Sequence, residues 1–235
     1  MARPKSKKST RSQPSTAQRT TSQTLWLVLG LAGLAVLALI IAGMLSRSQE
    51  TPKTAQLAAE VGASGKVLGS PDAPVEVWDF SDFHCPHCRT FAVGAAQRLI
   101  EEYVKPGKVR FVYKHFIVLR SYQAANASEC AAEQGKFWEY HDYLYTKQET
   151  DAPFTPEELK QYARDLGLDI NTFEQCVDTG KYMEVVLKDM EEGRALGVRG
   201  TPTIFVNGEM VPNGARWANL KEAVERALQQ AQARD

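Results

Sequence analysis

An uninterrupted apolar segment near the N-terminus divides this 235-residue chain into two parts. Leu25–Leu45 contains no charged or strongly polar side chain over 21 residues. As an α-helix rising about 1.5 Å per residue, the segment would span roughly 31 Å, which matches the roughly 30 Å hydrocarbon core of a bilayer. We therefore predict a single N-terminal transmembrane helix, an anchor at residues 24–46. The alternative is a cleaved signal peptide, but the apolar region of such a peptide is usually only about 7 to 15 residues long.

Charge is distributed unevenly on the two sides of this segment. Residues 1–23 contain six basic residues and no acidic one, whereas the rest of the chain has 22 basic and 28 acidic residues, a net charge of −6. Because positively charged flanks remain in the cytoplasm, we expect a disordered cytoplasmic tail at 1–23 and an extracytoplasmic C-terminal part. That part lacks the basic excess of a nucleic-acid binder, so we expect no nucleic-acid partner. Polar residues 47–66, with a short helical pattern at 55–61, are predicted to form a flexible linker.

Residues 67–235 alternate between strand and helix patterns. A strand at Val75–Phe80, a helix from Cys88 to about Val104 and a strand at Val109–Phe116 predict a βαβ unit, whose strands are usually parallel. Further along the chain, helical spacing covers residues 121–135, 137–147, 156–167 and 171–193. Strand patterns at 203–206 and 209–211 then flank Asn207-Gly208, which is a hairpin signal. An amphipathic helix is predicted at 217–230. The sequence therefore predicts an α/β fold with a helical insertion at about 118–195.

Cys85-Pro86-His87-Cys88 lies where the first strong strand pattern meets the first helix pattern. A thiol at a helix N-terminus is stabilised as a thiolate by free backbone N–H groups and the helix dipole. The two intervening residues allow the second sulfur to close a small disulfide ring, and His87 can add a positive charge or a hydrogen-bond donor. This pattern favours dithiol–disulfide exchange.

Two segments together carry a resemblance to a known family. Asp79–Cys88 (DFSDFHCPHC) and Gly197–Thr203 (GVRGTPT), separated by the helical insertion, resemble the DsbA-type thiol-disulfide oxidoreductases of the thioredoxin superfamily. The resemblance covers residues 67 to about 230 and implies a thioredoxin fold with an inserted helical domain. It also implies that the Thr201-Pro202 bond is cis and faces the redox cysteines. Without the resemblance a trans bond would be expected, because only about 5 to 6% of X-Pro bonds are cis.

The resemblance also implies roles for other side chains. Asp79 would be a buried acid that relays the proton of Cys88, although an acid at a strand end can equally be solvated. Cys130 and Cys176 would form a second, structural disulfide, which oxidation outside the cytoplasm would favour; two buried free thiols are the alternative. Pro86 and His87 form the intervening dipeptide associated with oxidising members of the family.

These patterns predict a membrane-anchored oxidase that uses Cys85 and Cys88 to introduce disulfides into exported proteins. By analogy with the family, a quinone-linked membrane protein of the DsbB or VKOR type would re-oxidise it, and no bound cofactor or metal is expected. A reductase or isomerase would use the same centre. A metal-binding module with His84, Cys85, His87 and Cys88 as ligands is a remote alternative, because four donors within five residues cannot readily surround one tetrahedral ion.

Overall fold

The computed structural model describes residue 29 and residues 53–148 and 154–233. The chain divides into two compact units, residues 1–49 and 50–235. The predicted cytoplasmic tail and, apart from Leu29, the predicted membrane anchor lie outside the described residues. No helix among the described residues combines the length and the apolar character needed to cross a bilayer.

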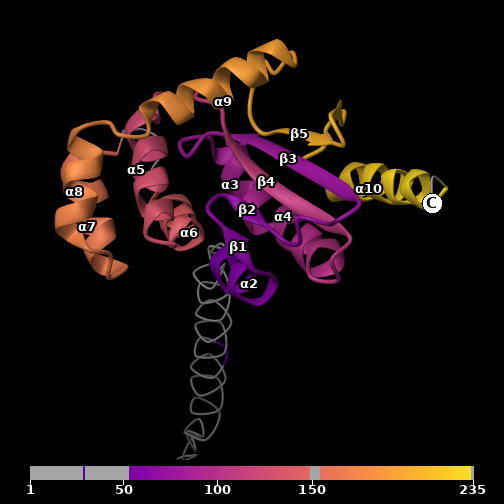
Figure 1. Cartoon of the computed structure of the whole chain (residues 1–235), viewed down its shortest axis with the longest axis horizontal. Coiled ribbons are helices and arrows are strands. Elements are labelled where there is room, and N and C mark those ends of the chain that lie inside the picture. The colour runs from indigo at the N-terminus through magenta and orange to yellow at the C-terminus, as the bar shows by residue number, and fades with distance from the viewer. Residues whose placement is uncertain (1–28, 30–52, 149–153, 234–235) are drawn as a thin grey trace, which may run out of the picture. The chain divides into compact units, whose positions relative to one another are not determined.

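A six-stranded sheet in the order β1-β2-β4-β3-β5-β6 forms the centre of the C-terminal unit (Figure 1). The two central strands, β3 and β4, are parallel, as predicted from the βαβ pattern, and the other neighbouring strands are antiparallel. The strands are β1 (Ala63–Ser64), β2 (Val67–Leu68), β3 (Val75–Ser81), β4 (Val109–His115), β5 (Thr203–Val206) and β6 (Glu209–Met210). Asn207 and Gly208, both with positive φ, connect β5 and β6, which confirms the predicted hairpin.

Helices precede the sheet, connect its strands and end the unit. They are α2 (Thr54–Val61), α3 (Pro86–Val93), α4 (Ala95–Leu99), the π-helix η1 (Ile100–Val104), α5 (Tyr122–Glu133), α6 (Phe137–Lys147), α7 (Pro156–Asp165), α8 (Ile170–Asp178), α9 (Met183–Ala195) and α10 (Trp217–Gln232). Helices α5 to α9 lie between β4 and β5 along the chain. They form the predicted helical insertion, so the α/β fold with an inserted helical domain is confirmed.

The helix expected between the parallel strands is interrupted once, between α3 and α4, and its last part is the π-helix η1. The break between α3 and α4 lies at Gly94, whose φ of −117° and ψ of −94° are not helical. A Cβ at this position would lie 3.1 Å from the Thr90 carbonyl oxygen, so the bend suits glycine. The apolar periodicity continues across the break, which explains why the sequence alone predicts one helix.

Part of the segment predicted to be a linker belongs to the folded unit. Helix α2 confirms the short helical pattern at 55–61, and it buries Leu57 and Ala58. The Ala55 backbone N–H donates to Asp142 Oδ2 in α6 over 2.8 Å. The predicted linker at 47–66 is therefore too long at its C-terminal end, because α2 has an apolar face that packs on the domain.

The two faces of the sheet are covered by different helices. Val75 and Val77 of β3 share one hydrophobic core with α3, α4 and α10. Phe80 packs in a separate core cluster with Phe116 and Phe205, against which Gly193 of α9 lies. Gly193 allows this close approach, since a Cβ there would lie only 2.7 Å from the Phe116 ring. The loop after β3 lies beside the insertion, because the Phe83 ring packs against His141 and Tyr145 of α6.

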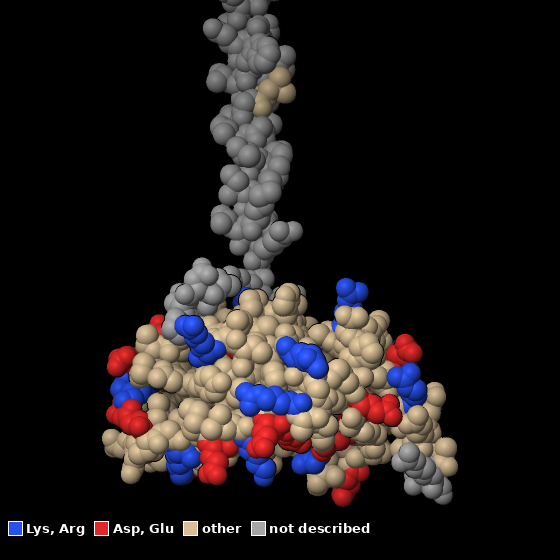
Figure 2. Space-filling view, turned by 90° about the horizontal axis from the view of Figure 1, so that it is seen from above, with Lys and Arg blue, Asp and Glu red and all other residues tan. Residues whose placement is uncertain are grey.

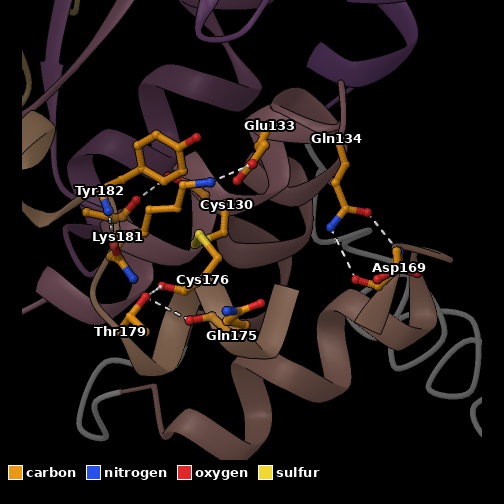
Figure 3. Close-up of a disulfide and its surroundings, with 12 residues drawn as sticks. Cys130, Glu133, Gln134, Asp169, Gln175, Cys176, Thr179, Lys181 and Tyr182 are labelled. Carbon is orange, nitrogen blue, oxygen red and sulfur yellow. Dashed lines mark hydrogen bonds and ion pairs between the residues drawn. A yellow bond between two sulfur atoms is a disulfide. The ribbon is translucent and has the colours of Figure 1, made fainter. Parts of the chain in front are cut away.

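A disulfide between Cys130 and Cys176 joins α5 to α8 within the insertion (Figure 3). Their Cα atoms are 5.9 Å apart, and the two residues are separated by 46 positions in the sequence. The Lys181–Glu133 ion pair, with an N–O distance of 2.6 Å, connects the end of α5 to the segment after α8. In the loop-entropy model a cross-link of this length contributes roughly 4 kcal/mol.

Candidate redox site

Cys85 caps the N-terminus of helix α3. It follows the buried end of β3, and its φ of −78° and ψ of 117° are extended rather than helical. Pro86 occupies the first turn, where a missing backbone N–H costs no helical hydrogen bond. The backbone N–H groups of the first turn therefore lie close to the Cys85 sulfur. This is the arrangement that stabilises a thiolate.

The pKa values of the two cysteines are shifted in opposite directions. A hydrogen bond from the Cys88 thiol, helped by Thr201 and by the backbone N–H groups of Cys88 and His87, lowers the pKa of Cys85 to about 5 against the opposing effect of burial. Burial raises the pKa of Cys88 well above its usual range. The hydrogen bond that the Cys88 thiol donates to Cys85 raises it further. At neutral pH the reduced site therefore holds one thiolate and one thiol.

Asp79 lies buried beneath the cysteines, with 4% of its surface exposed. Burial raises its pKa to about 7; a hydrogen bond from Ser81 Oγ, 2.6 Å from Asp79 Oδ1, opposes this rise, and the Cys85 charge adds to it. The negative charge of Asp79 in turn contributes to the raised pKa of Cys88. Of the two interpretations of Asp79, the structure shows the buried acid rather than a solvated one.

The Thr201-Pro202 peptide bond is cis and lies against the redox cysteines. The Cys85 sulfur lies 3.3 Å from the Thr201 carbonyl oxygen, to which it can donate a hydrogen bond only in its protonated form. A groove begins at this bond and continues along β5 and the segment before α10. Its lining residues include His87, Pro202, Ile204, Val211 and Arg216.

The four residues considered as metal ligands do not surround a common point. His84 is buried, and its Nε2 accepts a hydrogen bond from the Phe154 backbone N–H at 3.2 Å. Its ring also packs on the Phe154 ring, with 4.6 Å between centroids. His87 is exposed at the mouth of the groove. His84 therefore connects the redox loop to the helical insertion, and the geometry does not favour a metal site.

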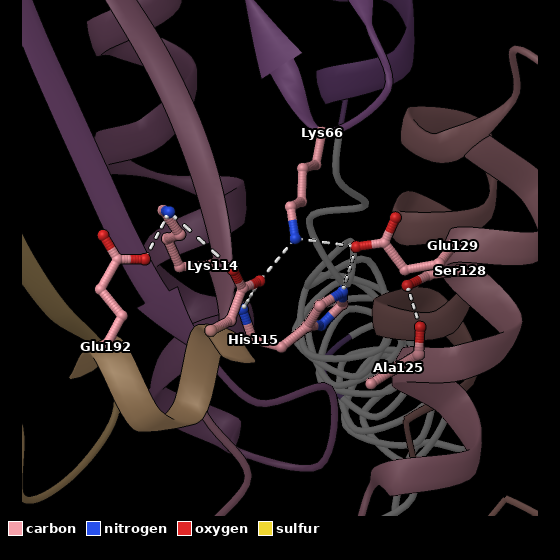
Figure 4. Close-up of polar contacts among 8 residues, drawn as sticks. Lys66, Lys114, His115, Ala125, Ser128, Glu129 and Glu192 are labelled. Atoms are coloured by element: carbon pink, nitrogen blue, oxygen red, sulfur yellow. Dashed lines mark hydrogen bonds and ion pairs between the residues drawn. The ribbon is translucent and has the colours of Figure 1, made fainter. Parts of the chain in front are cut away.

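Figure 4 shows a second cluster of polar side chains, which includes Lys66, His115 and Glu129. Among the described residues, only His115, Glu129 and Asp189 bring three potential metal ligands together. The Lys66 ammonium group lies 2.9 Å from Glu129 Oε1 and 2.5 Å from Asp189 Oδ2, and His115 Nε2 is 3.0 Å from the same Glu129 oxygen. Lys66 thus supplies the positive charge that these two carboxylates need.

Asp82 is a buried acid beside the redox cysteines whose contacts the sequence reasoning did not anticipate. It is fully buried three positions before Cys85, and its carboxylate accepts hydrogen bonds from the His84 backbone N–H in the redox loop and from the Val118 backbone N–H in the segment after β4. The available signal was an acidic residue inside an otherwise apolar and aromatic segment, since a buried carboxylate requires several donors.

Basic and acidic side chains are interspersed on the face of the C-terminal unit shown in Figure 2.

Comparisons with known proteins agree with this geometry. The thioredoxin family model matches residues 63–226. A probable disulfide bond formation protein D of Bacillus anthracis is 34% identical over 169 residues, which cover 68% of this chain and 77% of that protein. The structure is also similar to that of oxidised BdbD from Bacillus subtilis, with a TM-score of 0.65 and 29% identity over 71% of this chain and 94% of that one. Chlamydia trachomatis DsbA, at 21% identity over 72% of this chain and 91% of that one, shares the fold with a TM-score of 0.61.

The match covers both cysteines, the strand before them, the helical insertion and the cis-proline loop. The chain therefore belongs to the DsbA-type thiol-disulfide oxidoreductases of the thioredoxin superfamily.

Proposed function

We propose that this chain is a membrane-anchored oxidase that introduces disulfides into exported proteins through Cys85 and Cys88. The observation that carries this proposal is the opposite shift of the two thiol pKa values, with that of Cys85 lowered to about 5. A stable thiolate stabilises the reduced site relative to its disulfide, so the disulfide becomes a stronger oxidant. The similarity to proteins named for disulfide bond formation supports the same direction.

The first step is an attack on the Cys85 sulfur of the disulfide form. A substrate thiolate forms a mixed disulfide with Cys85, and the Cys85–Cys88 bond breaks with its electron pair on Cys88. Because the pKa of Cys88 is raised well above its usual range, this sulfur takes up a proton. Asp79, whose pKa is about 7, can exchange that proton at neutral pH.

The second step releases the oxidised substrate. A second substrate thiolate attacks the substrate sulfur of the mixed disulfide, and Cys85 leaves as a thiolate. The substrate has then lost two electrons and two protons. The enzyme has gained the two electrons, one proton resides on Cys88, and the other proton passes to solvent.

The cis-proline loop positions the substrate for these steps. Pro202 offers no backbone N–H beside the sulfurs, and the backbone of Thr201 is available to pair with an extended substrate strand. His87 lies at the mouth of the groove, where it can donate a hydrogen bond to a leaving thiolate. Pro86 begins α3 at a position where a helix needs no backbone N–H, and its fixed φ favours the helical turn after Cys85.

Re-oxidation and membrane attachment complete the proposal. A quinone-linked membrane protein of the DsbB or VKOR type would accept the two electrons, as in the family, and this chain itself would need no bound cofactor. The apolar segment at 24–46 would anchor the chain, with residues 1–23 in the cytoplasm and the catalytic domain on the opposite side. This placement gives the cysteines access to exported proteins.

Equilibrating the full chain with glutathione buffers tests the direction of the reaction. We expect a reduction potential well above that of thioredoxin, and a value near −270 mV would show a reductase instead. Cys85→Ser should abolish exchange in either direction. Cys88→Ser should accumulate mixed disulfides, because the second sulfur can no longer resolve them.

A further inference from the structure

Two buried tyrosines, Tyr113 of β4 and Tyr145 of α6, lie on the interior side of the redox site. Tyr113 pairs with Asp79 in the parallel register of β3 and β4, so the two side chains point to the same face of the sheet. Both tyrosines belong to the same core cluster as Cys88. Tyr113 is 0% exposed and Tyr145 is 1% exposed.

Phe83 of the redox loop packs against both tyrosine rings. Its ring stacks on the Tyr113 ring, with 5.3 Å between centroids and 15° between planes. It also lies against the Tyr145 ring, with 5.3 Å between centroids. The two rings are therefore held in place by the sheet, the insertion and the redox loop together.

Neither tyrosine hydroxyl has a hydrogen-bond partner among the described residues, although both oxygens are buried. In contrast, the hydroxyl of Tyr140, in the same helix as Tyr145, donates to the Leu159 carbonyl oxygen at 2.8 Å. Because nearly all buried polar groups in native proteins are paired, two unpaired hydroxyls beside a reacting sulfur indicate a role in the reaction.

The charges of the redox site act on both hydroxyls. Burial, and next the charge of Asp79, raise the pKa of Tyr113 well above its usual range, and the nearby Tyr145 hydroxyl opposes this rise. Burial, then Tyr113 and the charge of Cys88, raise the pKa of Tyr145 well above its usual range. Both tyrosines therefore keep their protons at neutral pH, and each remains a hydrogen-bond donor.

We propose that Tyr113 and Tyr145 donate hydrogen bonds to the Cys88 sulfur while it leaves the disulfide as a thiolate. In this step the substrate sulfur bonds to the Cys85 sulfur, and the electron pair of the broken Cys85–Cys88 bond passes to Cys88. The hydroxyls keep their protons, and the thiolate is protonated afterwards. Donors that are already in place where charge develops stabilise the transition state more than the ground state. This inference deepens the proposed function and rests on its first step.

Phenylalanine at both positions tests the proposal without breaking a hydrogen bond of the resting site. The Tyr113→Phe/Tyr145→Phe double variant removes two hydroxyls that have no partner and keeps the rings that pack on Phe83. The matched control is Tyr140→Phe, which removes a buried hydroxyl whose partner is the Leu159 carbonyl oxygen.

The first measurement is the pKa of Cys88 in the full chain after alkylation of Cys85. This form resembles the mixed disulfide, because the Cys85 sulfur carries a substituent and no charge. The remaining charged group that raises the pKa of Cys88 is Asp79, which is the same in every variant. The NMR chemical shift of the Cys88 Cβ atom, followed against pH, gives the pKa. We expect the double variant to raise this pKa by about one unit, a tenfold change in the ionisation constant, and Tyr140→Phe to leave it unchanged.

The second measurement is the rate at which reduced glutathione opens the Cys85–Cys88 disulfide of the full chain. We expect the double variant to slow this step about tenfold and Tyr140→Phe to leave the rate unchanged. Both changes are required, and the absence of either would overturn the proposal.

Two other results would also overturn it. A fall in the pKa of Cys88 would mean that the hydroxyls donate to Asp79, because losing donors favours the neutral carboxyl and reduces its repulsion of the thiolate. An equal shift in Tyr140→Phe would assign the effect to the loss of any buried hydroxyl. An incorrect oxidase assignment would change the reduction potential and not the response of Cys88 to the two tyrosines, so the two failures are distinguishable.

Discussion

Lowering the pH should destabilise the reduced protein more than the disulfide form. The physical reason is the Cys85 thiolate, which exists only in the reduced form. Its pKa is lowered from 9.0 in the unfolded chain to about 5 in the native structure. A group whose pKa is lowered by folding stabilises the native state above its unfolded pKa, and this contribution disappears as the pH falls through the native pKa.

The size of the effect follows from the two pKa values. At pH 7 the unfolded thiol is protonated and the native thiol is ionised, and two pH units separate pH 7 from the native pKa. At about 1.36 kcal/mol per unit this gives roughly 2.7 kcal/mol. Because the Cys85 sulfur is partly hydrated, solvent screening reduces this contribution to about 2 kcal/mol. At pH 4.5 almost none of it remains. The same 2 kcal/mol corresponds to a disulfide that is more oxidising by roughly 40 mV than one made from ordinary thiols.

Urea unfolding of the reduced and disulfide forms at pH 7 and pH 4.5 measures this difference. Groups whose surroundings are the same in both forms cancel when the two free energies of unfolding are subtracted. Asp79 does not cancel, because the Cys85 charge raises its pKa, and the Asp79→Asn variant therefore serves as a control. A stability difference that stays constant between the two pH values, in wild type and variant alike, would refute the argument from the thiolate.

Three further predictions concern stability. Because burial raises the pKa of Asp79 to about 7, ionisation of Asp79 should reduce the free energy of unfolding as the pH rises from about 4 through 7. Asp79→Asn should therefore raise the free energy of unfolding at pH 8 by about 2 to 4 kcal/mol. An equal pH dependence in wild type and variant would contradict this. Replacing Cys130 and Cys176 together with alanine should lower the urea midpoint by an amount equivalent to about 2 to 4 kcal/mol, and a midpoint unaffected by the replacement would argue against the bridge. Gly193→Ala should lower the free energy of unfolding, measured by thermal unfolding, by about 1 to 3 kcal/mol, because the new methyl group would lie 2.7 Å from the Phe116 ring. If the variant is as stable as wild type, α9 can move away from the sheet.

The redox site could be predicted from sequence as far as local spacing allows. Two cysteines with two residues between them, at the junction of a strand and a helix, belong to one short segment, so their proximity needs no tertiary contact. The broken helix after Cys88 shows the limit of this reasoning, because periodicity continues through Gly94 while the backbone bends there. Helix α2 shows another limit, since its helical pattern was visible but its packing on α6 was not.

By itself the sequence determined the parallel strand pair, the helical insertion and the position of the thiols at a helix N-terminus. Each of these depends on periodicity, turn residues or spacing within a few turns of the chain. The tertiary structure alone decided that Asp82 holds the segment around Leu119 and that Lys66 lies between two buried carboxylates, because these partners are separated by 37 to 123 positions. It also decided the burial that raises the pKa of Cys88, whereas the hydrogen bonds that lower the pKa of Cys85 come largely from Cys88 and His87 in the same short segment. Burial and distant contacts depend on how the elements pack together, and no local pattern in the chain encodes that packing.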